Sequence, residues 1–204
     1  MFFGIDTVFA LYCLLSGGQA AVASYDQALD RPSYAALDAA WAAIAQEKIP
    51  VSSIETLAVI DFTKPSYLKR MDIYERGECR AKRFFCAHGR NTGGIFATDF
   101  SNRSGSKQTS LGLYRVGSPY RGSWGKSLKL HGLESGVNDR AYHRKIVLHS
   151  AWYVSEEIIG QNIAEGLGPR IGRSLGCPAV RQEDLELVTG LLKDGTFLYI
   201  HGNP

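Results

Sequence analysis

The chain has 204 residues, of which 45% are hydrophobic and 21% charged, as in an ordinary soluble globular protein with one well-formed core. Its net charge is only +3 and no block of five like charges occurs, which argues against a nucleic-acid partner. These values predict a single domain and leave an acidic small substrate open.

The first residues have the composition of a secretory signal. Residues 7–23, "TVFALYCLLSGGQAAVA", combine a short apolar run with small residues, which predicts a signal peptide over 1–23, cleavage before Ser24 and export to the periplasm or cell envelope. The run is shorter than the roughly 18 apolar residues of a membrane span. Residues 1–6 carry Asp6 and lack Lys and Arg, so a buried N-terminal helix or strand is the alternative.

Cleavage of this signal would leave an odd number of cysteines in the mature chain. Cys13 would leave with the signal, so that at least one of Cys79, Cys86 and Cys177 stays free or pairs with another chain. The segment "ECRAKRFFCAHG" is predicted to be a strand, along which seven positions span roughly 23 Å. A disulfide needs alpha carbons about 4.4 to 6.8 Å apart, so we expect no bond between Cys79 and Cys86.

One amphipathic helix is predicted in the N-terminal segment, residues 24–50. Ser33 is the expected cap of a helix within residues 31–48. The side chains at helical spacing on its inward face are Tyr34, Leu37, Trp41 and Ile44.

Residues 51–204 predict a mainly β domain with flanking short helices. Short runs rich in β-branched and aromatic residues alternate with turn residues: "TLAVIDF", "YLKRMDIYER", "CRAKRFFCAHG", "SLGLYRVG", "SLKLHGL" and "KIVLHSAWYV". The loops between them are long and polar, as loops that carry binding surfaces often are. The segment "QEDLELVTGLLKDG" predicts a helix with Leu185, Val188 and Leu192 inward, ending near Gly195, before a closing strand "TFLYIHG".

Cys177 stands in the motif "GRSLGCPAV", residues 172–180. Gly176 permits unusual backbone angles and Pro178 fixes the exit of the chain, as in a turn that exposes a nucleophile. The amides of Gly176 and Cys177 are candidates for an oxyanion hole, and Arg173 for a substrate carboxylate. A cysteine in such a turn is also compatible with a purely structural role.

A nucleophilic cysteine needs a base, and His149 is the best placed of five histidines. It follows the apolar run "KIVL" at a predicted strand end, and the small Ser150 leaves room beside its ring. The histidine precedes the cysteine, which is the reverse of papain-type peptidases. Cys79, Cys86 and His88 lack the spacing of a zinc site, so no metal or cofactor is expected.

Together, "IVLHSAWYVS" and "GRSLGCPAV" resemble the murein L,D-transpeptidase catalytic-domain family, in its YkuD-like branch with a Gly-Cys-Pro-Ala motif. The segments "IDFTKPSYLKR", "AHGRNTGG", "FSNRSGSKQTSLGLYRVG", "YRGSWGKSLKLHGLESGVND" and "GTFLYI" extend the resemblance over residues 58–200. Many relatives carry histidine two residues before the cysteine, where this chain has Leu175.

The resemblance implies an L,D-transpeptidase-type β-sandwich with Cys177 as nucleophile and His149 as base. Ser174 and Gly176 would then shape the turn and the oxyanion site. The expected substrate-binding residues are Arg173, Ser150, Asn138 and His131. For two of these residues the alternative is a role outside substrate binding: His131 as a surface histidine and Asn138 as a turn residue.

The implied partners are peptidoglycan stem peptides. Cys177 would attack the carbonyl between meso-diaminopimelate and the terminal D-Ala, and a second diaminopimelate amine would resolve the thioester into a 3-3 cross-link. Water would instead give an L,D-carboxypeptidase. A wall-binding protein without turnover is the alternative from another class.

Overall fold

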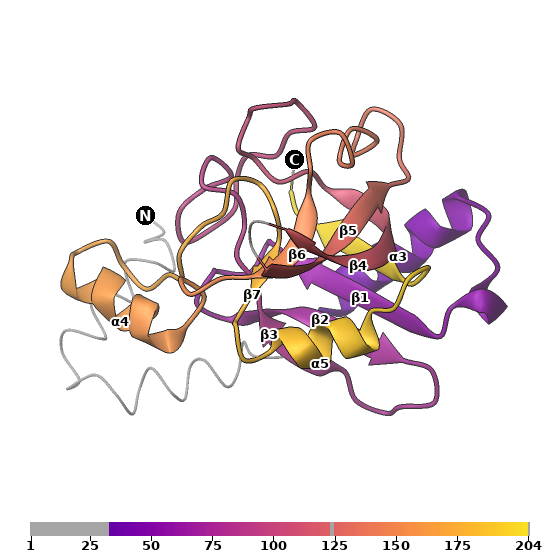
Figure 1. The fold of residues 1–204 in the computed structure, drawn as a ribbon, viewed down its shortest axis with the longest axis horizontal. Helices are drawn as coiled ribbons and strands as arrows, with labels where there is room; N and C mark the ends of the chain where they lie inside the picture. The colour runs from indigo at the N-terminus through magenta and orange to yellow at the C-terminus, as the bar shows by residue number, and fades with distance from the viewer. Residues whose placement is uncertain (1–32, 123–124, 204) are drawn as a thin grey trace, which may run out of the picture. The chain divides into compact units, whose positions relative to one another are not determined.

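The computed structural model describes residues 33–122 and 125–203. In them, eight strands form one sheet of order β3-β2-β1-β8-β4-β5-β6-β7 (Figure 1). The strands are β1 Thr56–Asp61, β2 Lys69–Glu75, β3 Lys82–Phe85, β4 Gly112–Gly122, β5 Gly125–Gly132, β6 Val147–Ser150, β7 Ala179–Val180 and β8 Phe197–His201. The helices are α3 Tyr34–Gln46, η1 Val51–Ser53, α4 Glu156–Ala164 and α5 Leu185–Leu191. The predicted signal peptide, residues 1–23, lies outside the described residues.

The sheet curves until its two edges meet. Adjacent strands are antiparallel except for the parallel pairs β1–β8 and β6–β7. Beyond β3, Ala87 forms an antiparallel bridge to Ala179 of β7, at the opposite edge. The mainly β architecture with short flanking helices is therefore confirmed, as one nearly closed sheet.

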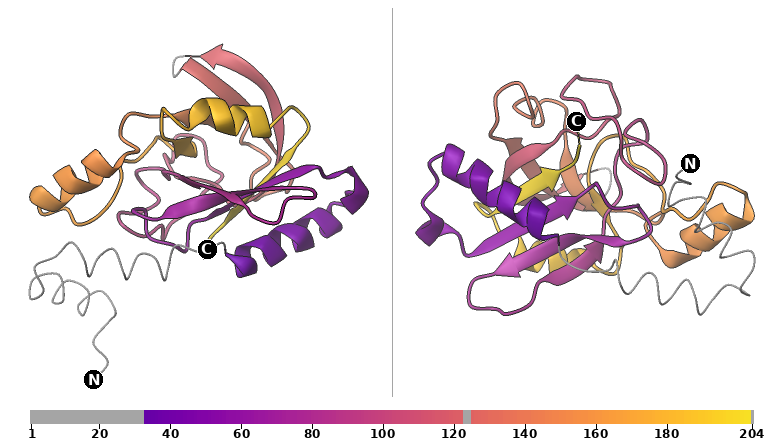
Figure 2. Two further views of the ribbon diagram at one scale, coloured as in Figure 1. Left: turned by 90° about the horizontal axis from the view of Figure 1, so that it is seen from below. Right: turned by 180° about the vertical axis from the view of Figure 1, so that it is seen from behind.

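Successive side chains of β1 point to opposite faces of the sheet and enter two separate hydrophobic clusters. Ala58 and Ile60 point into the cluster enclosed by the curved sheet, whereas Leu57 and Val59 point outward to a second cluster. Helix α3 covers this outer face and α5 lies on the opposite side of the strands (Figure 2). Each helix thus buries one face of the same sheet.

Helix α3 confirms the predicted helix and its cap. The Ser33 hydroxyl accepts from Ala36 N–H at 3.3 Å. Its inward face differs from the prediction, because Tyr34 is 74% exposed and the small side chains of Ala36, Ala40 and Ala43 make the closest contact. Ile44 is buried as predicted, and Leu37 and Trp41 pack at the rim.

The helix α5 and the strand β8 agree with the elements predicted from the sequence near the C-terminus. Leu185, Val188 and Leu192 are all buried beneath α5, as predicted. The helix ends at Leu191, a few residues before the predicted end, and the closing strand β8 lies centrally between β1 and β4.

The predicted strand around the first two cysteines is shorter in the structure. Only Lys82–Phe85 form β3, and Cys79 lies in the exposed turn that precedes it. Cys86 is fully buried, and both thiols are free. The prediction that they form no disulfide is confirmed.

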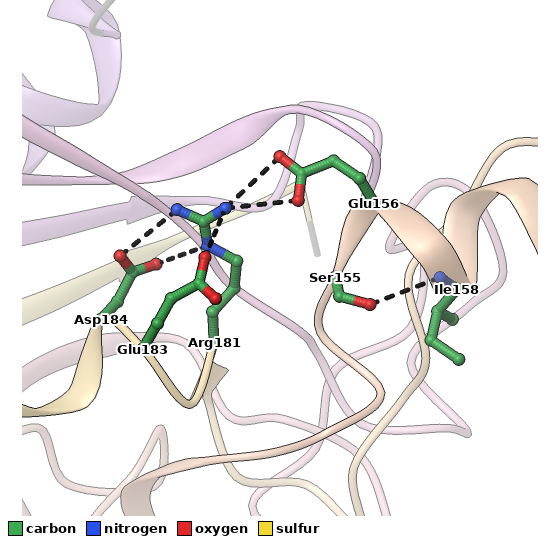
Figure 3. A network of polar contacts seen from close by, with 6 residues as sticks. All are labelled: Ser155, Glu156, Ile158, Arg181, Glu183 and Asp184. Atoms are coloured by element: carbon green, nitrogen blue, oxygen red, sulfur yellow. Dashed lines mark hydrogen bonds and ion pairs between the residues drawn. The ribbon is translucent and has the colours of Figure 1, made fainter.

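Helix α4 is absent from the sequence prediction. Ser155 caps it by accepting from Ile158 N–H at 3.4 Å. Arg181, directly after β7, pairs with Glu156 at 3.3 Å and with Asp184 at 2.8 Å, so that it joins the start of α4 to the approach of α5 (Figure 3). The helix has no fully buried residue, which explains its weak apolar signal.

Across the described residues, no helix has the length and apolarity to cross a membrane.

Candidate active site

The chain enters and leaves the Cys177 turn through sheet-like contacts. Ser174 pairs with Gly89 in a parallel bridge before the turn, and Ala179 pairs with His149 after it. Gly176 has a φ of +123°, and a Cβ there would lie 2.9 Å from the Gln108 carbonyl oxygen. The turn therefore requires glycine at this position for both backbone conformation and space.

Ser174 closes the turn from inside. Its buried hydroxyl accepts from Gly176 N–H at 3.0 Å and donates to the Cys177 carbonyl at 2.5 Å. The amide of Gly176 is thereby engaged within the turn, so it does not serve as the oxyanion donor considered from the sequence. The amide of Cys177 remains as the candidate donor from this turn.

His149 lies on β6, the strand next to the outgoing arm of the cysteine turn. Its register partner on β7 is Ala179, two residues after Cys177. The ring is buried and its Nδ1 lies 2.8 Å from the Ser150 carbonyl oxygen. Because a carbonyl only accepts, Nδ1 carries the proton in the neutral ring and Nε2 keeps its lone pair.

Burial favours the neutral forms of both groups. It lowers the pKa of His149, and the hydrogen bond from Nδ1 to Ser150 only partly offsets this. Burial likewise raises the pKa of the Cys177 thiol, against the opposing effects of the Val147 backbone N–H and the charge of Arg144. Both shifts favour an uncharged thiol and an uncharged imidazole at neutral pH.

A polar hollow lies next to the turn. Its volume is about 340 Å³ and it is lined by Asn91, Ser101, Arg103, Ser104, Gly105, Ser106 and Gln108. Residue 108 connects it to the active turn, since the Gln108 carbonyl faces Gly176 and the neighbouring Thr109 hydroxyl donates to the Gly176 carbonyl at 3.1 Å. The 101–110 loop thus lies between this hollow and the cysteine turn, and neither Cys177 nor His149 lines the hollow.

The residues expected to bind substrate have different surroundings in the structure. Ser150 lies beside His149 and holds its ring through the backbone carbonyl. The Arg173 guanidinium donates to the carbonyls of Arg90 and Gly93 at 3.1 and 2.9 Å, so it braces a loop. His131, on β5, stacks on Tyr142 with ring centroids 4.9 Å apart.

Asn138 is fully buried and its amide is used inside the protein. It donates to the carbonyls of Leu111 and Leu113 at 2.9 and 3.0 Å and accepts from Glu134 N–H at 2.9 Å. This geometry corrects the substrate-binding expectation: the side chain organises the turn after β5 and has no reach to a ligand.

His88 lies in the interior, next to the cysteine turn. His88 is buried, accepts from Arg70 at 2.7 Å through Nδ1, and its carbonyl accepts from Ser174 N–H at 2.9 Å. His88 therefore packs in the interior and also supports the cysteine turn. Among the described residues, no group of three or more His, Cys, Asp or Glu side chains is arranged to hold a metal ion.

Arg144, which precedes β6, was not predicted from the sequence. Its guanidinium donates to the 101–110 loop, including the Ser101 and Gln108 carbonyls at 2.7 and 2.6 Å. The only sequence signal is a basic residue shortly before the His149 strand, which is typical of many exposed turns. Nothing local indicates that its partners lie more than thirty residues earlier in the chain.

A family model described as the L,D-transpeptidase catalytic domain matches residues 29–201. The chain therefore belongs to the L,D-transpeptidase catalytic-domain family. The matched range begins before α3 and ends in β8. No curated protein sequence matches the chain.

The chain is also similar to several solved structures, all at low sequence identity. An L,D-transpeptidase from Mycobacterium smegmatis is 11% identical, covering 72% of this chain and 59% of its own, with a TM-score of 0.42. An L,D-transpeptidase from Mycobacterium tuberculosis H37Rv is 15% identical, covering 72% and 58%, with a TM-score of 0.44. The cell shape determining protein Pgp2 from Campylobacter jejuni is 14% identical, covering 73% and 47%, with a TM-score of 0.45. The matched region is less than two thirds of each of these chains.

Proposed function

We propose that the protein is a cysteine acyltransferase of peptidoglycan that cleaves the bond between meso-diaminopimelate and D-Ala and forms 3-3 cross-links. The observation that carries this proposal is the pairing of His149 with Ala179, which sets a buried imidazole of fixed tautomer alongside the Cys177 turn. Family membership supports the substrate class. Action on the cell wall implies an exported protein, in agreement with the predicted signal.

The first half-reaction forms a thioester. Nε2 of His149 takes the Cys177 proton as Sγ attacks the carbonyl carbon of the diaminopimelate–D-Ala bond. The Cys177 N–H donates to the oxyanion of the tetrahedral intermediate. Nε2 then protonates the departing amine, D-Ala leaves, and the tripeptide acyl group stays on Sγ.

The second half-reaction returns the enzyme to its starting state. The side-chain amine of a second diaminopimelate attacks the thioester carbonyl and gives a proton to His149 Nε2. Collapse of this intermediate expels Sγ, which recovers the proton, and an amide joins the two stems. With water as the acceptor, the same steps give an L,D-carboxypeptidase.

Product analysis tests this proposal. The purified chain is incubated with a diaminopimelate-containing disaccharide tetrapeptide, and the products are identified by mass spectrometry. A dimer that has lost one D-Ala supports transpeptidation, and tripeptide alone supports the carboxypeptidase. Unchanged substrate with a folded, substrate-binding protein would contradict catalysis and favour a wall-binding role.

The acid limb of the pH profile should reflect His149. Burial lowers the pKa of this ring from its ordinary value of 6.5, so the base stays neutral into mildly acid solution. Activity is lost only as pH falls through that lowered pKa, and we expect the acid midpoint of kcat/KM below 6.5. A midpoint above 6.5 would contradict His149 as a buried neutral base.

Replacing Gly176 should disturb the turn more than the rest of the fold. In Gly176→Ala the new Cβ would meet the Gln108 carbonyl at 2.9 Å in a backbone region that disfavours side chains, at a cost of about 1–3 kcal/mol. We expect turnover at least about tenfold slower. Gly190→Ala is the matched control, because a Cβ on that helical glycine meets nothing within 4 Å. Equal turnover in the two variants would contradict the assigned role of the turn.

A further inference from the structure

We propose that Arg144 is a positioning residue for the nucleophile, which clamps the 101–110 loop against the cysteine turn and sets a positive charge near Cys177 Sγ. The inference rests on the proposed function only in taking Cys177 as the nucleophile. It adds a residue that the family motifs in this sequence do not contain.

The clamp consists of four hydrogen bonds from one guanidinium. Nη1 donates to the Ser101 carbonyl at 2.7 Å and the Ser110 hydroxyl at 3.1 Å. Nη2 donates to the Gln108 carbonyl at 2.6 Å and the Ser106 hydroxyl at 3.3 Å. These contacts fix both ends and the middle of the loop that lines the polar hollow.

The clamped loop is in direct contact with the cysteine turn. The Gln108 carbonyl that Arg144 holds is also the atom that faces Gly176. One residue further, the Thr109 hydroxyl accepts from Gly89 N–H at 3.0 Å and donates to the Gly176 carbonyl at 3.1 Å. Displacement of the loop would therefore displace the backbone that presents the thiol.

The charge of Arg144 has no acidic partner among the described residues. All four of its acceptors are neutral, and no ion pair within the described part of the chain includes it. Its neighbour Lys145 accepts the weak hydrogen bond of Cys177 Sγ at 3.7 Å through the backbone carbonyl. An uncompensated cation next to that contact stabilises a thiolate more than a thiol.

Burial raises the pKa of the Cys177 thiol, and the charge of Arg144 opposes this rise. Burial also lowers the pKa of Arg144, and Tyr114 and Cys177 partly offset this by favouring the protonated guanidinium. Burial lowers the pKa of His149 on β6 and raises that of Tyr153 to about 12, which favours the neutral form of both. Arg144 is therefore the side chain whose positive charge acts on the thiol.

Alkylation of the thiol tests the charge without requiring turnover. The rate of iodoacetamide addition to Cys177 is measured at pH 7 by peptide-resolved mass spectrometry, because Cys79 is also exposed. In Arg144→Gln we expect this rate to fall about tenfold, because loss of the positive charge raises the pKa of the thiol and leaves less thiolate. Arg144→Lys retains the charge and should stay within about threefold of the wild type.

The second measurement tests the clamp. Backbone amides of residues 101–110 should exchange with deuterium faster in both Arg144 variants, since lysine cannot make the four contacts of the guanidinium. Arg115→Gln is the matched control, because Arg115 is exposed on β4 and its guanidinium lies 5.7 Å from the Phe197 ring centroid.

Two results would overturn the inference. One is an unchanged alkylation rate in Arg144→Gln; the other is an equal loss in the Gln and Lys variants, which would leave only a structural role. Because alkylation needs no peptidoglycan, an inactive wild-type protein that still shows the tenfold difference would refute the proposed function and not the role of Arg144.

Discussion

The variant Cys177→Ala is expected to lose acyl transfer by more than about a thousandfold while its unfolding temperature stays close to that of the wild type. The thiol is only partly buried, and the hydrogen bond that it donates is a weak contact of 3.7 Å to the Lys145 carbonyl. Removing Sγ therefore deletes the nucleophile at little cost to packing. Product formation and thermal unfolding are measured on the same preparation.

Cys86→Ala is the matched control for this variant. The Cys86 side chain is fully buried, and burial raises the pKa of its thiol to about 12, so it cannot supply a thiolate at neutral pH. We expect this control to keep its turnover and to lose about 1 kcal/mol of stability. If Cys177→Ala instead lost stability and kept turnover, Cys177 would be a structural thiol.

The second large effect is expected at Arg70, the largest fully buried side chain of the described residues. Its guanidinium donates to the carbonyls of Cys86 and Lys64 at 2.7 and 3.1 Å and to His88 Nδ1 at 2.7 Å. Burial lowers the pKa of Arg70 to about 10, so it remains charged at neutral pH. It also lies 4.6 Å from the centroid of the Phe62 ring.

Arg70→Ala should lower the free energy of unfolding by at least about 3 kcal/mol, because it removes the donor to the buried Cys86 carbonyl and to His88 Nδ1 and opens a cavity. Urea unfolding measures the loss. Arg115→Ala, which removes an exposed guanidinium, should cost less than about 1 kcal/mol. A loss at Arg70 no larger than at Arg115 would show that the buried network contributes little to stability.

Local patterns were sufficient for most of the sheet and for the candidate nucleophile and base. Alternation and β-branched residues predicted the central strands, and the residue types around Cys177 and after the apolar run of His149 predicted a reactive turn and a strand end. These signals are local because a strand and a turn are specified largely by neighbouring residues.

The rest of the site depends on contacts between distant parts of the chain. The clamp of Arg144 on Gln108 joins residues 36 positions apart, and Arg173 reaches the Gly93 carbonyl 80 positions away. A sequence shows that arginine is present but not which carbonyls it will meet. For this reason Arg173 was predicted to bind substrate and Arg144 was not predicted at all.

Helix α4 was not predicted and β3 was predicted too long for similar reasons. Helix α4 is held by its Ser155 cap and by Arg181, which comes 25 residues after Glu156, and not by a buried apolar stripe. The predicted strand begins directly after the turn at Gly77, whose φ is +83°, and residues 78–81 stay irregular before β3 begins at Lys82. Tertiary contacts and single turn residues decide both cases, against weak local preferences.

The central claim is that Cys177 carries the acyl group, and intact-protein mass spectrometry tests it most directly. Wild type and Cys177→Ala are mixed briefly with the disaccharide tetrapeptide, quenched in acid and weighed, with and without hydroxylamine. We expect an adduct of the acyl group without D-Ala on the wild type alone, and hydroxylamine should remove it because a thioester reacts with hydroxylamine. An adduct on Cys177→Ala as well, or turnover with the adduct on another residue, would contradict it.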